Sequence, residues 1–160
     1  MKNQCYSFLT TIFTTCLAVT GESADMHKKN QDSPFGNYYW NVSAVTIHPA
    51  LDVDLDGKPD TDLRILVPDC EKDDSERYFA NGTIVSNRGL VRCDEEEEPE
   101  EEVGTWSYDE SMRTIIMENY DTNNPVEAQI ESASDSEIVL VSQHQSSIGT
   151  HTIRMILKRK

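Results

Sequence analysis

The strongest constraint on the fold of this chain is the way apolar and polar residues alternate over short runs. Val126, Ala128 and Ile130 are separated by charged or amide residues, and Ile153 and Met155 by a cation. A period of two is that of a half-buried β-strand rather than of a helix. Such runs, separated by turn signals, predict an all-β fold of eight strands. The expected strands cover residues 37–47, 76–80, 83–87, 104–108, 113–118, 126–131, 137–142 and 150–158.

Local sequence signals predict one hairpin and one helical turn. Asn81-Gly82 is a pair that favours a tight hairpin, so it should join the second and third strands. Only the segment 61–67 is expected to form a helical turn, and Pro68 would end it because a proline disfavours helical geometry in the residue before it.

Short antiparallel strands in sequence order must hide their edges. A meander does this most simply by curling into a closed barrel. We therefore expect an eight-stranded antiparallel up-and-down barrel or a strongly curled meander. A barrel of this size is either filled by side chains or just wide enough for one small ligand.

The beginning of the chain reads as a secretory signal. Lys2 precedes an apolar run over residues 6–19, which is too short and too rich in threonine to span a bilayer comfortably. We expect a signal peptide at 1–24, a linker at 25–33 and one domain at 34–160, secreted or held in the cell envelope. Cys16 is either an acylated lipoprotein cysteine, which would be the only membrane attachment, or an ordinary residue of a cleaved peptide.

A D-x-D-x-D-G-x-x-D run follows the first expected strand and predicts a calcium-binding loop. Its ligands would be the carboxylates of Asp52, Asp54, Asp56 and Asp60 with the carbonyl of Lys58. The twelfth position lacks the bidentate glutamate of a helix-flanked calcium hand, so affinity should be weak, at roughly 10⁻⁴ to 10⁻³ M. The alternative is a solvated acidic turn, since Asp and Gly are common in turns.

Cys70 and Cys93 remain after removal of the signal, and an even pair in an oxidising compartment predicts a disulfide. Neither cysteine has the spacing of a zinc or redox site. The disulfide should act as a cross-link that stabilises the fold.

The formal net charge of -15 argues against nucleic acid as a partner, because such binding depends on neutralising phosphates. Much of this charge lies in the acidic run 94–102, whose self-repulsion and central proline predict a solvated loop. The alternative for this run is a docking surface for a cationic protein partner.

Several short motifs occur along the domain in a defined order and spacing: Phe35–Trp40, Asp60–Leu63, Cys70–Asp74, Tyr78–Gly82 and Gly104–Trp106. Taken together, they resemble the lipocalin-like domain of small envelope lipoproteins from Bacteroidetes. The resemblance implies a secreted, calyx-shaped β-barrel that usually has no assigned ligand or activity.

The aromatic residues carry the expected binding function. Tyr38, Trp40, Phe79, Trp106 and Tyr108 would contribute to the barrel wall or its lumen, either as core or as the lining of a pocket for a small apolar or sugar-like ligand.

Enzymatic activity is not expected. His48, His144 and His151 lie in or beside turns and at a strand start, and no nucleophile elbow, zinc motif or glycine-rich phosphate loop is present. The favoured interpretation is a binding module. The alternatives are a protein-interaction or structural envelope component with a filled barrel, and a hydrolase that uses paired carboxylates.

Overall fold

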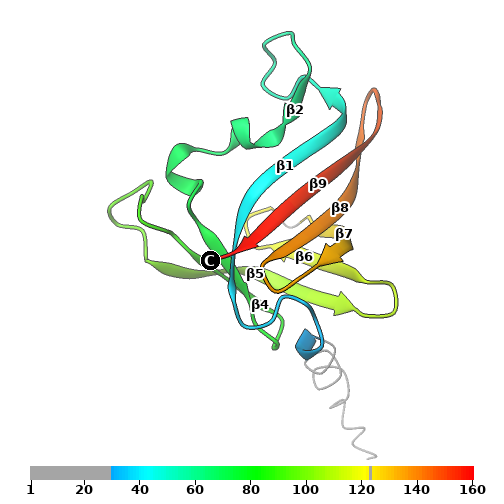
Figure 1. Ribbon diagram of the computed structural model, residues 1–160. Helices are drawn as coiled ribbons and strands as arrows, with labels where there is room; N and C mark the ends of the chain where they lie inside the picture. The colour runs from blue at the N-terminus through cyan, green and yellow to red at the C-terminus, as the bar shows by residue number, and fades with distance from the viewer. Residues whose placement is uncertain (1–29, 123) are drawn as a thin grey trace, which may run out of the picture.

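The computed structural model describes residues 30–122 and 124–160. The expected signal peptide, Cys16 and residues 25–29 of the expected linker lie outside this range. The described chain forms one antiparallel sheet that curls on itself (Figure 1). Its elements are β1 (Tyr39–Leu51), β2 (Asp60–Asp62), the short 3₁₀ helices η1 (Leu63–Leu66) and η2 (Asp69–Glu71), β3 (Ser75–Tyr78), β4 (Thr83–Asn87), β5 (Glu100–Asp109), β6 (Thr114–Asn119), β7 (Val126–Ala133), β8 (Glu137–Ser146) and β9 (Gly149–Arg159).

The sheet is a closed eight-stranded barrel. Strands β3 to β9 pair in sequence order, and β1 pairs with β3 on one edge and with β9 on the other. The prediction of an all-β, eight-stranded antiparallel barrel is confirmed, and so is the hairpin at Asn81-Gly82, where Gly82 adopts a φ of 92°. The ninth strand, β2, was not expected. It is three residues long and pairs with the far end of β1.

The barrel seam between β1 and β3 is short, since only Tyr39 and Trp40 pair with β3. Beyond that point the edge of β1 is covered by a segment that we call the strap, residues 63–74, which contains η1 and η2. Arg64 of the strap donates from Nη1 to the carbonyls of Val42 (2.6 Å) and Ser43 (3.0 Å). A side chain thus replaces the missing strand pairing. The expected helical turn before Pro68 is confirmed as η1, with Asp62 as its cap.

One end of the barrel is filled by aromatic rings. Phe35 is fully buried, and its ring centroid lies 4.5 Å from that of Tyr78 and 5.5 Å from that of Trp106. The carbonyl of Phe35 accepts a hydrogen bond of 2.8 Å from Nε1 of Trp40. The segment before β1 therefore closes this end, which we call the plugged end.

The described part of the expected linker packs on the barrel. Asn30 is 3% exposed, donates to the carbonyl of Trp106 and accepts from the backbone N–H of Tyr108. The folded domain therefore begins no later than Asn30, four residues before the boundary expected from the sequence.

The acidic run is only partly a loop. Residues 94–99 lie in the loop between β4 and β5, as expected, but Glu100, Glu101 and Glu102 pair with β4 as the first residues of β5. Their carboxylates accept hydrogen bonds from Tyr39, Arg88 and Tyr120, respectively. These donors, the first residue of β1 and the residues just after β4 and β6, offset the repulsion that predicted a loop for Glu100, Glu101 and Glu102. That part of the prediction is wrong.

Candidate functional site

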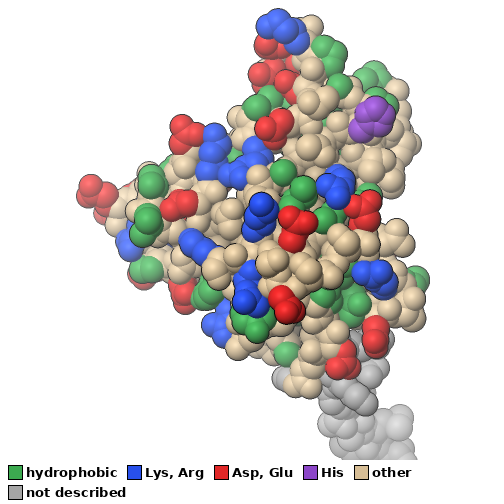
Figure 2. Space-filling view, in the orientation of Figure 1, with side chains coloured by type: hydrophobic (Ala, Val, Ile, Leu, Met, Phe, Trp, Pro, Cys, Tyr) green, Lys and Arg blue, Asp and Glu red, His purple; other side chains and the backbone are tan. Residues whose placement is uncertain are grey.

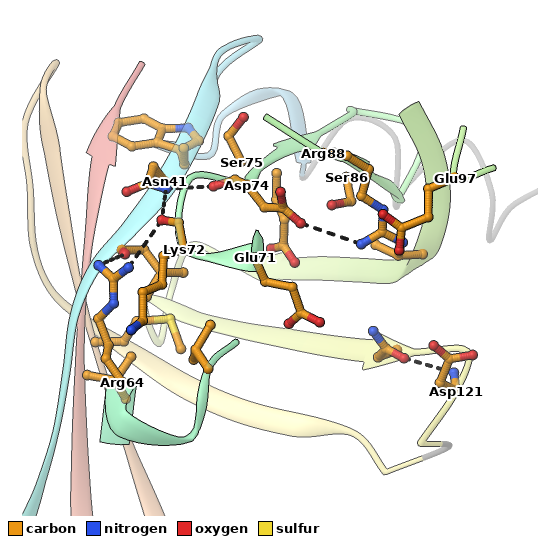
Figure 3. A pocket seen from close by; sticks show the side chains of 18 residues that line it. Asn41, Arg64, Glu71, Lys72, Asp74, Ser75, Ser86, Arg88, Glu97 and Asp121 are labelled. Carbon is orange, nitrogen blue, oxygen red and sulfur yellow. Dashed lines mark hydrogen bonds and ion pairs between the residues drawn. The ribbon is translucent and has the colours of Figure 1, made fainter. Parts of the chain in front are cut away.

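A cavity of about 520 Å³ occupies the end of the barrel opposite the plug. The strap, the inner faces of β1, β3 and β4, and the loop before β5 surround it (Figure 3). One part of its wall is apolar and is formed by Trp40, Val42, Val45, Val67, Val103 and Met155. The charged part is formed by Glu71, Asp74, Glu76, Glu97 and Asp121 with Arg64, Lys72 and Arg88.

Strand register explains why a carboxylate lies inside the barrel. Glu76 on β3 pairs with Trp40 on β1 and with Ser86 on β4, and both of these neighbours are buried. Tyr78, two residues further along β3, points to the same side because side chains alternate along a strand. Tyr78 belongs to the core cluster, so Glu76 faces the interior one step closer to the cavity.

The carboxyl of Glu76 accepts a hydrogen bond of 2.6 Å from the hydroxyl of Tyr78. Burial raises the pKa of Glu76, and the charge of Asp74 raises it further, while the hydrogen bond from Tyr78 acts in the opposite direction. Burial also raises the pKa of Tyr78 well above its usual value, so the phenol keeps its proton and remains a donor.

Asp74 sits at the junction of the strap and β3. One of its oxygens lies 3.5 Å from Nη1 of Arg88, whose Nη2 is 3.0 Å from Glu101. Figure 3 shows Asp74 and Arg88 facing each other, with Glu71 extending into the same space. Burial raises the pKa of Asp74, an effect that Arg88 partly opposes.

Several buried polar atoms around the cavity have no hydrogen-bond partner among the residues that the structure describes. They are Oδ1 of Asp74, Oγ of Ser75 and Nε of Arg88. Unpaired buried polar atoms are costly and rare in folded proteins. Their concentration at one cavity indicates a place where a polar ligand or water completes the hydrogen bonding.

The Cys70–Cys93 disulfide, confirmed here with a Cα–Cα distance of 5.2 Å, joins the strap to the loop between β4 and β5. Glu71 and Glu97, which lie close in sequence to the two cysteines, both line the cavity. The disulfide therefore holds two sides of the mouth together. It also indicates an oxidising or extracellular compartment.

The five aromatic residues expected at a pocket are spread over the barrel. Trp40 borders the cavity, whereas Trp106 and Tyr108 are core side chains. Phe79 lies on the plugged end, where its ring is under the guanidinium of Arg77 at 4.6 Å. Tyr38 is 49% exposed and stacks with Arg159 on the outside.

The predicted calcium loop projects beyond the barrel between β1 and β2, and acidic side chains gather on it (Figure 2). Carboxylate oxygens of Asp52, Asp54 and Asp60 lie within 4.8 Å of one another, so these three residues could hold a metal ion. Oδ1 of Asp52 is buried without a hydrogen-bond partner in the described chain. The carboxylate of Asp56 instead accepts from the backbone N–H and Nζ of Lys58.

The three histidines that the structure describes do not border the cavity. His48 and His144 are exposed. His151 is buried at the β8–β9 hairpin, with its ring nitrogens 2.8 Å from the carbonyl of Pro49 and 2.9 Å from Oγ of Ser146. These contacts fasten the hairpin to the end of β1.

Comparisons with known proteins found no match, whether with protein-family models, with curated proteins or with solved structures. Within residues 30–122 and 124–160, no helix has the length and hydropathy needed to cross a bilayer.

Sequence reasoning did not identify Asp74, Glu76 and Arg88 as site residues. A signal was present for Glu76, because it shares a strand face with Tyr78, and a carboxylate on an apolar strand face is unusual. No motif marks Asp74 or Arg88. They meet because they continue the β3–β4 hairpin one position beyond the Ser75–Asn87 pair.

Proposed function

We propose that this protein is a secreted, lipocalin-like binding module of the cell envelope, without enzymatic activity, that holds one small ligand in the cavity opposite the plugged end. The observation that carries the proposal is the 520 Å³ cavity whose wall combines an apolar side with unpartnered polar atoms. A cavity of that volume suits a small molecule.

A sugar-like ligand fits this wall better than a purely apolar one. An apolar ligand would leave Asp74, Ser75 and Arg88 with the same unpaired atoms, whereas hydroxyl groups donate and accept hydrogen bonds. Carbon-bound faces of a sugar ring could pack on Val42, Val103 or Met155.

Tryptophan fluorescence tests the proposal, because Trp40 borders the cavity. The mature protein would be titrated with a panel of monosaccharides, short oligosaccharides and fatty acids. Val103→Phe should fill part of the cavity and abolish the response to any ligand found. Ile116→Phe, on the exposed face of β6, is the matched control and should leave it unchanged. Equal responses in the two variants would place the ligand elsewhere and defeat the proposal.

A carboxylate-dependent hydrolase is the second candidate. One observation favours it: burial raises the pKa of both Asp74 and Glu76, and both line one cavity. A carboxyl with a raised pKa is what a general acid requires. Any sugar that binds would be recovered after prolonged incubation and analysed by mass spectrometry, since a binding module returns it intact and a hydrolase does not.

Calcium is proposed for the loop formed by residues 52–60. The support is the proximity of the Asp52, Asp54 and Asp60 carboxylates and the unpartnered Oδ1 of Asp52, since Ca²⁺ prefers carboxylate and carbonyl oxygens. The role would be structural, because the loop projects away from the barrel (Figure 1). Lipid anchoring at Cys16 and a cationic partner for the acidic run remain predictions from the sequence.

A further inference from the structure

The charged wall of the cavity is unbalanced. Five carboxylate side chains line it against three cationic ones. The chain as a whole carries a formal net charge of -15, so remote charges add to the negative potential rather than offset it.

The three cations are already engaged. Arg64 donates to the carbonyls of β1 and to the carbonyl of Lys72 at 3.1 Å. Lys72 pairs through Nζ with Asp69 at 2.6 Å, and Arg88 lies between Asp74 and Glu101. Nε of Arg88 lacks a hydrogen-bond partner in the described chain, but both Nη atoms of that guanidinium face carboxylates, so an anion there would meet the negative charges of Asp74 and Glu101.

Glu71, Glu76, Glu97 and Asp121 line the cavity without forming an ion pair with a lysine or arginine of the described chain. Of these, Glu76 lies next to the core, and the hydrogen bond that it accepts comes from the neutral hydroxyl of Tyr78. An ionised carboxylate removed from bulk water is stabilised by a nearby positive charge. The protein supplies none at this position, whereas a ligand could.

A second observation also indicates a polar ligand. Ser75 is 2% exposed, lines the cavity and has an Oγ without a hydrogen-bond partner in the described chain. Oδ1 of Asp74, the preceding residue, also lines the cavity and lacks a hydrogen-bond partner in the described chain. An ammonium group offers three donors and no acceptor, which matches the carboxylates of Asp74 and Glu76.

We infer that the cavity selects small amphipathic amines, with the ammonium group bound by Glu76 and Asp74 and the carbon part packed on Val42 and Val103. This inference rests on the proposed ligand-binding function and names the class of its ligand. Amino sugars and short alkylamines both satisfy it, since each joins a positive charge to carbon-bound surface.

Isothermal titration with matched pairs of probes tests it. Glucosamine would be compared with glucose, and hexylamine with 1-hexanol, at pH 7 and low salt. Each amine should bind about tenfold or more tightly than its neutral partner, because charge-assisted hydrogen bonds are stronger than neutral ones. Added salt should reduce the difference through screening.

Two variants test which residue causes the preference for amines. Glu76→Gln keeps the shape and the contact with Tyr78 while removing the charge, and it should abolish the preference for amines. Glu118→Gln makes the same change in net charge at an exposed position of β6 and should keep the preference. Asp74→Asn is the second test if Glu76→Gln does not fold, as judged by its melting curve.

The outcomes separate the two proposals. If glucose or 1-hexanol binds as tightly as its amine, the amine inference is wrong while the ligand-binding function stands. If an amine preference survives in both Glu76→Gln and Asp74→Asn, the ammonium site lies elsewhere and the inference is also wrong. If no compound of either panel binds to the folded wild type, both proposals fail.

Discussion

The carboxyl of Glu76 and the hydroxyl of Tyr78 are joined by a hydrogen bond of 2.6 Å inside the barrel, two residues apart on β3. Tyr78 packs in the aromatic plug, while Glu76 faces the cavity. This contact is the boundary between the filled and the open halves of the lumen.

Replacing Glu76 should stabilise the protein at neutral pH. Burial raises the pKa of Glu76 in the barrel above the ordinary 4.5. At a pH between the pKa of Glu76 in the unfolded chain and its higher pKa in the barrel, the folded protein binds more protons than the unfolded chain. The free energy of unfolding therefore falls as pH rises through this window. Above the window the full destabilisation is present, and Glu76→Gln removes it. The melting temperature of Glu76→Gln should therefore exceed that of the wild type at pH 7.

The difference in melting temperature between Glu76→Gln and the wild type should shrink in acid. Below pH 4.5 Glu76 is protonated in both states and resembles glutamine, so the two melting temperatures should converge. Melting followed by circular dichroism from pH 4 to pH 8 checks this, with Glu118→Gln as the surface control. A variant that is less stable than the wild type at pH 7 would show that the carboxylate has a favourable partner.

Removing the disulfide should lower the free energy of unfolding by about 3 kcal/mol, because the bond closes a loop with a sequence separation of 23 residues. Urea denaturation of Cys70→Ser, Cys93→Ser and the double variant measures this. The three should agree, since each lacks the same covalent bond. Two reactive thiols in the oxidised wild type would contradict the pairing.

Ca²⁺ should raise the melting temperature. At ten times the dissociation constant of a millimolar site, binding adds about 1.4 kcal/mol to the free energy of unfolding. Asp54→Asn should abolish this response because Asp54 belongs to the group of three neighbouring carboxylates. Asp56→Asn makes the same charge change at a carboxylate that contacts Lys58. The sequence pattern predicts that both variants lose the stabilisation by Ca²⁺ equally. The structure predicts a smaller loss for Asp56→Asn. If the wild type ignores Ca²⁺, the loop is only a turn.

Phe35→Ala should cost about 3 to 5 kcal/mol, the usual range for removing a buried phenylalanine ring. Phe35 is fully buried and its ring contacts those of Tyr78 and Trp106, so its removal would open a void at the plugged end. Urea denaturation gives the change in stability. Tyr38→Ala, at a half-exposed ring on the outer face, should cost much less. Similar losses for the two variants would argue against the plug.

Most of the fold follows from local patterns. Alternation along β7 and β9, and the Asn81-Gly82 turn, are read from neighbouring residues and reappear in the structure. β2 was missed because its three residues, Asp60–Asp62, carry no apolar alternation and depend on the edge of β1. The start of β5 was missed because the hydrogen-bond donors to its glutamates, Tyr39, Arg88 and Tyr120, are distant from it in sequence.

The site depends on contacts that are distant in sequence, and this limits prediction. Aromatic residues indicated a pocket, yet Phe35 fills the space between Tyr78 and Trp106 and turns that end into core. The cavity at the other end exists because Arg64 holds the strap against β1, 21 and 22 residues away in the chain. No period or motif encodes that arrangement.

The plug also sets a direction. The described chain enters at Asn30, beside β5 and next to the aromatic plug, while the charged cavity opens at the opposite end of the barrel. If residues before Asn30 tether the protein to a surface, the opening of the cavity would face away from that surface. Ligands could then enter it directly from solution.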